Sequence, residues 1–220
     1  FNQTPHDVTV LTHEAGHAFQ VFQSRNHMPD YVWPTFEACE IHSMSMEFLT
    51  WPWMNLFFKE DTDKFKYYHM TTAIKFLPYG VTVDEFQHEV YENPELTPQE
   101  RRMKWLEVER KYLPSRYYEE IPELDEGLFF YRQGHLFSVP FYYIDYTLAQ
   151  VCAFQFWKKA NENREKAWEE YLHLCKQGGT KPFLELVKEA NLENPFKDGT
   201  ISNIVPELKK YLDSVDASEF

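Results

Sequence analysis

Apolar residues recur along most of this chain at the three- and four-residue spacing that is typical of amphipathic helices. The pattern predicts helices over about residues 8–24, 35–50, 63–77, 83–92, 97–112, 140–161, 163–176 and 200–215, and one more that opens at Thr180-Lys181-Pro182. Val8, Thr9 and Val10 are β-branched and would suit a short strand, but Asp7 fits an N-cap and favours the helix. With no internal repeat, low-complexity tract or linker, we expect one mostly helical, all-α domain over residues 1–220.

Prolines and glycines supply the predicted ends of these helices. Pro78-Tyr79-Gly80 is expected to stop one helix and Asn93-Pro94 to stop the next. Thr97-Pro98-Gln99-Glu100 forms a capping box with proline at the first helical position, which is a strong start signal. Residues 119–134 are acidic and then aromatic without a helical period, so we expect a loop with a short turn or strand there.

Charge and hydropathy exclude two classes of partner. The chain carries a formal net charge of −13, and phosphate recognition needs a basic face, so nucleic-acid binding is not expected. A negative field could attract cationic peptides, although ordinary solubility explains it equally well. No apolar run approaches the roughly 18 residues that a membrane span needs. We therefore expect no membrane insertion.

Cysteine usage and the absence of a visible secretory signal favour a cytoplasmic protein. Cys39, Cys152 and Cys175 contain no C-x-x-C pair, which argues against a disulfide scaffold and for a reducing compartment. The chain starts at Phe1 and reaches a catalytic-looking motif almost at once. We expect that an N-terminal segment of a longer enzyme is missing and packs on this chain.

That motif is LTHEAGHAFQ, from Leu11 to Gln20. On a helix His13 and His17 project from one face, so both can bind one metal ion. Glu14 lies about 100° around the helix from His13, which suits a carboxylate that takes a proton from an activated water. Gly16 leaves room for another backbone or for substrate. The alternative is an ordinary amphipathic helix with polar histidines, because H-E-x-x-H also occurs by chance.

A third metal ligand is expected on a neighbouring helix, since a catalytic zinc usually has three protein ligands and an open position for water. The segment TFEACEIHSMSMEF supplies four candidates: Glu37, Glu40, His42 and Glu47. The three glutamates share one face of the predicted helix. A solvated stripe would explain them too, but their apolar neighbours favour burial around a metal and its supporting groups.

These segments resemble the thimet oligopeptidase and oligoendopeptidase F family of zinc metallopeptidases, most closely the Pz-peptidase-like oligoendopeptidases. The resemblance rests first on D-V-x-V-L-T-H-E-A-G-H-A-F-Q and E-I-H-S-M-S-M-E. It extends to G-H-L-F-S-V-P-F-Y-Y-I-D-Y and to C-K-Q-G-G-T-K-P-F-L-E-L-V, and so spans nearly the whole chain. It implies a zincin-like, almost all-helical catalytic domain, with a deep channel between two halves that admits short unfolded peptides. This chain would be the zinc-bearing C-terminal part.

Carried over by position, the resemblance makes His13, His17 and Glu40 the Zn²⁺ ligands and Glu14 the general base. Glu37 matches an acidic position that would orient a ligating histidine, and Glu47 matches a recurrent acid that we take as structural. The role of His42 stays open. The remaining histidines, which have no partner motif, are expected at the surface or at helix caps: His6, His27, His69, His88 and His173.

The resemblance also assigns substrate and transition-state contacts to His135 and to tyrosines of the run from Gly134 to Tyr146. If Pro140 starts a helix, Tyr142 and Tyr146 share one face and Tyr143 lies adjacent. We rank His135 and Tyr146 first, then Tyr142, then Tyr143. The alternative is that these tyrosines only pack an aromatic-rich helix.

The leading interpretation is a zinc endopeptidase that cleaves oligopeptides internally by water attack. A peptide-binding helical module with a structural zinc is a second possibility, but such a site would have no use for Glu14 as a base. A different zinc hydrolase, such as an aminopeptidase, is a third, and mapping of cleavage positions would separate it from the first.

Overall fold

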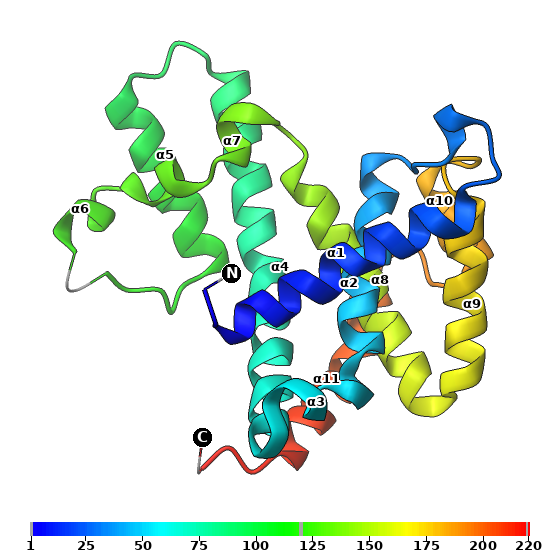
Figure 1. The fold of residues 1–220 in the computed structure, drawn as a ribbon. Helices are drawn as coiled ribbons and strands as arrows, with labels where there is room; N and C mark the ends of the chain where they lie inside the picture. The colour runs from blue at the N-terminus through cyan, green and yellow to red at the C-terminus, as the bar shows by residue number, and fades with distance from the viewer. Residues whose placement is uncertain (1, 119–120, 219) are drawn as a thin grey trace. The chain divides into compact units, whose positions relative to one another are not determined.

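The computed structural model describes residues 2–118, 121–218 and 220, and every regular element among them is helical. By their contacts the residues divide into two compact units, Phe1–Thr72 with Leu148–Phe220, and Ala73–Thr147. Two long helices, α4 (Thr62–Glu92) and α8 (Tyr143–Glu162), contribute to both units (Figure 1). The prediction of an all-α chain is confirmed.

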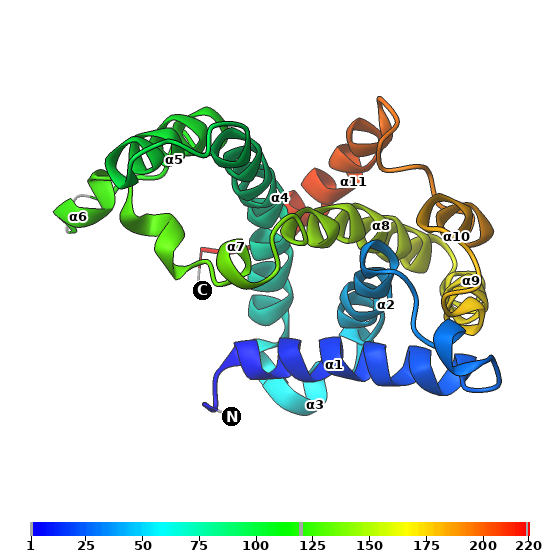
Figure 2. The same ribbon diagram turned by 90° about the horizontal axis from the view of Figure 1, so that it is seen from above.

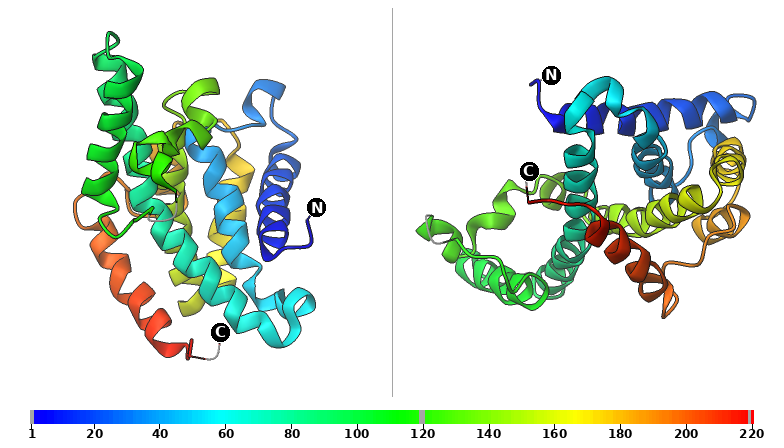
Figure 3. Two further views of the ribbon diagram at one scale, coloured as in Figure 1. Left: turned by 90° about the vertical axis from the view of Figure 1, so that its left-hand side faces the viewer. Right: turned by 90° about the horizontal axis from the view of Figure 1, so that it is seen from below.

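The first unit is built around α2 (Phe36–Leu49). Residues 38–46 of this helix are all buried, which is unusual for a segment that carries charged side chains. Helix α1 (Pro5–Ser24) crosses one side of α2, and α8 lies on the other side (Figures 2 and 3). Phe48 at the end of α2 lies 5.7 Å from Phe154 of α8, measured between ring centroids. The alternative of a solvated stripe is therefore excluded for residues 38–46.

The rest of the first unit consists of helices that close around this pair and short turns that connect them. Helix α9 (Arg164–Gln177) contacts both α1 and α2, and α10 (Phe183–Glu189) contacts α2 and α9. The remaining elements of the unit are η1 (Pro29–Tyr31), η2 (Trp51–Trp53), α3 (Asn55–Phe58), η3 (Lys59–Asp61) and α11 (Thr200–Ser214). The predicted helices 163–176 and 200–215 are thus present within a residue or two.

Helix α1 begins earlier than the sequence suggested. Its N-cap is Thr4 rather than Asp7, and Pro5 occupies the first turn. Asp7 instead accepts a hydrogen bond from the Thr4 backbone N–H at 2.8 Å, as the acidic partner of a capping box does. Helix α5 (Pro98–Tyr112) starts with the capping box that was predicted at Thr97.

The predicted stop at Pro78-Tyr79-Gly80 is wrong, because α4 runs through it without a break. Proline removes one helical donor and favours a kink, but it does not forbid a continuous helix. Gly80 has another purpose: a Cβ built there would lie 1.9 Å from Thr147 Oγ1. The glycine permits a close approach to the start of α8 and is not a terminator.

The second unit packs around an aromatic core. Val83, Phe86, Trp105, Phe129 and Phe130 are buried together and join α4, α5 and η4 (Leu128–Arg132). The predicted loop between residues 119 and 134 therefore includes η4 and the short α6 (Pro122–Asp125), while Glu119 and Glu120 lie outside the described residues.

The start of the helix predicted over 140–161 is also corrected. Helix α8 begins at Tyr143 rather than at Pro140, and a short helix, α7 (His135–Ser138), precedes it. Phe141 between them has a φ of 64°, which belongs to the left-handed region and prevents a helix from running through it. None of the helices that the described residues form is long and apolar enough to cross a membrane.

Candidate metal centre

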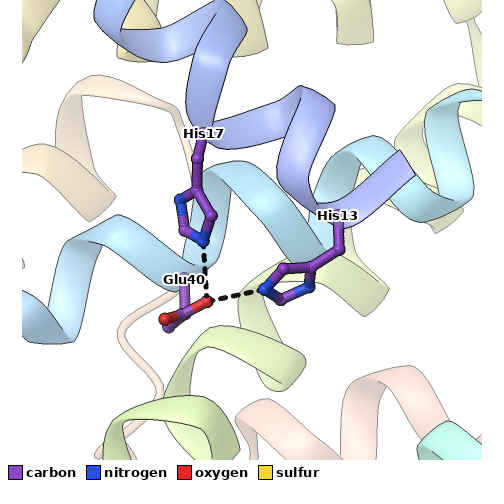
Figure 4. A group of neighbouring side chains, drawn as sticks. All are labelled: His13, His17 and Glu40. Atoms are coloured by element: carbon purple, nitrogen blue, oxygen red, sulfur yellow. Dashed lines mark ion pairs between the residues drawn. The ribbon is translucent and has the colours of Figure 1, made fainter. Parts of the chain in front are cut away.

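The site is built where α1 and α2 approach each other most closely. Gly16 makes this approach possible, because a Cβ at this position would lie 2.7 Å from both the His42 carbonyl oxygen and the Ser43 Cα. The backbone of α2 thus fills the space that a side chain would need. His13 and His17 flank this glycine on α1 and project toward Glu40 of α2 (Figure 4).

Three metal-binding atoms converge in the gap. The Nε2 atoms of His13 and His17 lie 3.2 Å and 3.4 Å from Glu40 Oε2. All three atoms lie within 4.8 Å of one another. The ligand atoms of a tetrahedral zinc with bonds of about 2.0–2.1 Å are separated by roughly 3.3 Å. The spacing of these nitrogens and this oxygen therefore fits one such ion.

The chemistry of the donor set supports the same fit. His13 Nδ1 lies 2.7 Å from Glu47 Oε1 and donates its hydrogen there, which leaves a lone pair on Nε2 in the neutral ring. That lone pair faces the Glu40 carboxylate, whose side chain is only 5% exposed. Two lone pairs this close repel each other in a buried place unless a proton or a metal ion lies between them. The two histidines and Glu40 are suited to hold a metal ion there.

Behind His13 lies a second group of polar side chains. Glu47 bonds His13 through Oε1 and His69 through Oε2, both at 2.7 Å. His69 Nδ1 in turn accepts a hydrogen bond of 2.9 Å from the Trp51 indole N–H. Metal-binding histidines commonly have such a carboxylate partner, which fixes the orientation of the ring. Glu47 therefore orients His13, the task that the resemblance assigned to Glu37.

The electrostatics of this group follow from its burial and its pairing. Burial lowers the pKa of His13, but the hydrogen bonds and charges of Glu40 and Glu47 outweigh it and raise the pKa to about 10. Burial raises the pKa of Glu47, and the hydrogen bonds from His13 and His69 more than reverse this, so its pKa lies below the usual value. Glu47 is thus an anion, and without a metal His13 is the cation that pairs with it.

The other candidate site residues of α1 and α2 differ in how deeply they are buried. Glu14 lies beside His13 on α1 with an exposed side chain, and Glu37 is half-buried in the first turn of α2. His42 is fully buried with its Nδ1 3.5 Å from Cys175 Sγ, and burial lowers its pKa to about 3. His42 is therefore a neutral core residue, and it is not part of the group of ligand atoms formed by the described residues.

Residues 1–205 match peptidase family M3. The chain belongs to this family. Among curated proteins it is 30% identical over 206 residues to the oligoendopeptidase F homologue of Borreliella burgdorferi, a match that covers 86% of this chain and 34% of that protein. The recognition of an oligoendopeptidase-type metallopeptidase is thereby confirmed at the level of the family.

Solved structures of family M3 have the same fold. The chain superposes on Pz peptidase A, which was solved with an inhibitor, with a TM-score of 0.96, 59% identity and coverage of 98% of this chain and 39% of that one. A Bacillus anthracis protein assigned as an oligoendopeptidase F gives a TM-score of 0.87 at 54% identity, over 100% of this chain and 36% of the other. The zincin-like helical fold class is confirmed, and the chain spans less than two-fifths of these relatives.

The histidine and tyrosines of the run 134–146 form a cluster of their own in the second unit. The ring centroid of His135 on α7 lies 5.1 Å from that of Tyr143 and 5.7 Å from that of Tyr146. Tyr142 lies 4.9 Å from Tyr146. All four side chains are half-buried. Burial, more than the neighbouring tyrosines, raises the pKa of Tyr143, so this hydroxyl stays neutral and able to donate.

A short chain of hydrogen bonds holds His135. The Tyr79 hydroxyl donates to Gln133 Oε1 at 2.8 Å, and Gln133 Nε2 lies 2.7 Å from His135 Nδ1. The amide nitrogen can only donate, so His135 Nδ1 accepts and its hydrogen sits on Nε2 in the neutral ring. Gln133 could not be predicted as part of this cluster, since a single glutamine in a loop belongs to no motif.

Two more residues of the metal centre were missed from the sequence. His69 was expected at the surface or at a cap, but its side chain is 7% exposed, and that expectation is wrong. Trp51 was expected to be core, which is correct but incomplete, because its N–H bonds His69. Neither residue belongs to a local motif. The three cysteines are buried, and none of them is in a disulfide.

Proposed function

We propose that this chain carries the metal-binding part of a zinc endopeptidase that hydrolyses internal bonds of short peptides. The observation that carries the proposal is the convergence of His13 Nε2, His17 Nε2 and Glu40 Oε2 beside Glu14, in a chain of peptidase family M3. The proposal includes three further statements: the ion is zinc, the substrates are oligopeptides and the location is cytoplasmic.

Zinc, when bound, would supply the Lewis acid that polarises the scissile carbonyl and makes water acidic enough to attack it. Glu14 is the base in this proposal. Its carboxylate neighbours His13 on α1, and its side chain is exposed and accessible to a substrate. It accepts the proton of the attacking water and later delivers it to the nitrogen of the departing amine.

The His135 cluster would donate hydrogen bonds to the carbonyl oxygen as negative charge develops on it. His135 can do so through Nε2–H, which the Tyr79–Gln133 pair leaves as the donor. Neutral tyrosine hydroxyls suit the same task, with Tyr146 ranked first and Tyr142 second. These assignments rest on the family resemblance and on the chemistry of the side chains.

A structural zinc in a peptide-binding module is the less favourable interpretation. Structural sites usually have four protein ligands and no open position. The described residues offer three ligand atoms at this place, with an exposed carboxylate next to them. Such a set leaves a coordination position for water or substrate.

The test is a measurement of metal content and peptide cleavage on the natural full-length protein. We expect one zinc per chain, and cleavage at internal bonds of a fluorescence-quenched peptide, with products identified by mass spectrometry. Release of single N-terminal residues would point to an aminopeptidase. Full cleavage by protein that has been stripped of metal would refute the proposal.

A further inference from the structure

Trp51, His69, Glu47 and His13 form one continuous chain of hydrogen bonds that ends at the metal centre. The links are Trp51 Nε1 to His69 Nδ1 at 2.9 Å, His69 Nε2 to Glu47 Oε2 at 2.7 Å, and Glu47 Oε1 to His13 Nδ1 at 2.7 Å. The four residues come from η2, α4, α2 and α1. The chain thus connects four separate segments of the first unit.

The indole decides the direction of every bond in this chain. A tryptophan Nε1 can only donate, so His69 Nδ1 must accept and has no hydrogen. The neutral ring then carries its hydrogen on Nε2 and donates it to Glu47. With one carboxylate oxygen occupied in this way, the other accepts the hydrogen of His13 Nδ1. In the neutral ring of His13, Nε2 then has a lone pair, and this nitrogen faces Glu40.

Packing holds the His69 ring in this orientation. Phe65 stacks on it with an interplanar angle of 7°, and Phe48 lies on it at 4.7 Å between centroids. A ring turned by half a revolution would present carbon atoms to the Trp51 N–H and to the Glu47 carboxylate. Both groups would lose a buried hydrogen-bond partner and would keep the cost of their desolvation. The orientation with two hydrogen bonds is therefore strongly favoured.

We propose that Trp51 and His69 are positioning residues of the metal centre, which act through Glu47 to hold His13 in the tautomer that leaves Nε2 free for the metal. The inference rests on the proposed function, since it takes His13 to be a zinc ligand. Neither residue touches the metal or the substrate. Their effect is on the affinity for zinc, because any tautomer of His13 with a hydrogen on Nε2 has no lone pair to offer there.

Three variants of the natural full-length protein separate this role from packing, with zinc affinity measured by competition with a chromogenic chelator. His69→Phe keeps an aromatic ring but removes the donor to Glu47, and should weaken zinc binding roughly 10- to 100-fold, as loss of an outer partner of a metal ligand does. His69→Gln should recover most of this affinity, because its amide can donate to Glu47 and accept from the indole. Trp51→Phe should weaken binding by a smaller factor.

Trp157→Phe is the matched control. Trp157 is buried in the same aromatic cluster, 6.5 Å from Trp51 between ring centroids, and has no place in the chain of hydrogen bonds. It should bind zinc as the wild type does. If His69→Phe binds zinc with wild-type affinity, or if His69→Gln is no better than His69→Phe, the positioning role is refuted.

A spectroscopic measurement on the unaltered protein decides the case even where a variant does not fold. In protein labelled with ¹⁵N-histidine, with the His69 signals assigned in the unaltered protein through its sequence neighbours, Nδ1 should show the shift of an unprotonated ring nitrogen and Nε2 that of an N–H. A hydrogen on Nδ1 would overturn the inference. Wild-type protein that binds no zinc would refute the proposed function instead, so the two failures can be told apart.

Discussion

Glu14 follows the half-buried His13 on α1, and its own side chain is exposed. Glu14→Gln keeps the shape of the side chain and removes its ability to take up a proton. Since the three ligand atoms belong to other residues, we expect zinc content to stay at the wild-type level. Turnover should fall by about 10²- to 10⁴-fold or more, which is the usual contribution of a general base. Near-normal peptidase activity in this variant would show that the assigned mechanism is wrong.

The choice of Glu40 over Glu37 as the third ligand has a direct test. Glu40 is buried and its Oε2 lies within 3.4 Å of both histidine nitrogens, whereas Glu37 is half-buried one turn earlier on α2. Glu40→Ala should lose zinc, because a site with two remaining ligands binds the ion much more weakly. Glu37→Ala is the matched control and should retain it. Both are measured as metal content after gel filtration, and the reverse result would assign the ligand to Glu37.

For the tyrosine cluster the prediction concerns the rate of peptide cleavage and not the binding of metal. Tyr146→Phe removes one hydroxyl and leaves the ring contacts with His135 and Tyr142 intact. If the hydroxyl donates to the developing oxyanion, turnover should fall by roughly 10- to 1000-fold with zinc content unchanged. Tyr142→Phe should have a smaller effect. Unchanged turnover in both variants would mean that these rings serve only to pack the helix.

The ligands of the candidate centre could be predicted from the sequence because their arrangement is local. His13 and His17 lie one turn apart on any helix, so their common face does not depend on the rest of the fold. The partner of His13 could not be predicted in this way. Whether Glu37 or Glu47 reaches its Nδ1 depends on where α1 crosses α2, and His69 comes from a third helix. Such contacts are set by packing and leave no local pattern.

At the scale of helices, most elements could be predicted from the sequence. The prediction was wrong where a residue that often ends a helix serves another structural role. Pro78 and Gly80 are typical of a helix end, and they were interpreted so. In the structure α4 tolerates the proline, and Gly80 is required by the contact with Thr147. A glycine that ends a helix and one that admits a neighbour look alike in a sequence. The same ambiguity did not mislead at Gly16, because the surrounding H-E-x-x-H motif indicated a close approach.

Gly16→Ala tests how the contact between helices supports the metal centre. Alanine favours the helix, so intrinsic propensity alone would stabilise α1 by about 1 kcal/mol. The new Cβ would however meet backbone atoms of His42 and Ser43 at 2.7 Å, and these cannot move independently of α2. We expect a net loss of about 1–3 kcal/mol in the free energy of unfolding, as overpacking causes. Zinc affinity should fall as well, since the change pushes His17 away from Glu40.

Ala15→Gly provides the control for this variant. Ala15 is exposed on the same helix, so its replacement lowers helix propensity without bringing any atom closer to α2. It should reduce stability slightly and leave zinc affinity unchanged. If Ala15→Gly weakens zinc binding as much as Gly16→Ala does, the loss comes from the helix itself and not from its distance to α2.

At the scale of the molecule, the first unit surrounds charged residues with apolar ones. Residues 38–46 of α2 are buried, and the carboxylates of Glu40 and Glu47 are stable there because histidines of α1 and α4 pair with them. The cluster around His135 belongs to the second unit and has its own aromatic core. Sequence analysis predicted one domain and could not see this division, because α4 and α8 run through it as regular helices. The assignment of residues 1–220 as a catalytic domain stays a prediction.

The last prediction concerns the chain on its own. It covers only 34% to 39% of the length of the relatives named above. Several large apolar side chains of its first unit are exposed to solvent. Leu11 and Phe22 of α1 are 55% and 57% exposed, and Met28 is 66% exposed. Apolar surface of this kind usually has a partner, and we expect it to be covered by another segment of the longer enzyme. Residues 1–220 expressed alone should therefore bind a hydrophobic dye, elute as aggregates in gel filtration and show no turnover above that of full-length Glu14→Gln. A monodisperse, fully active 220-residue monomer would show that the chain needs no such partner.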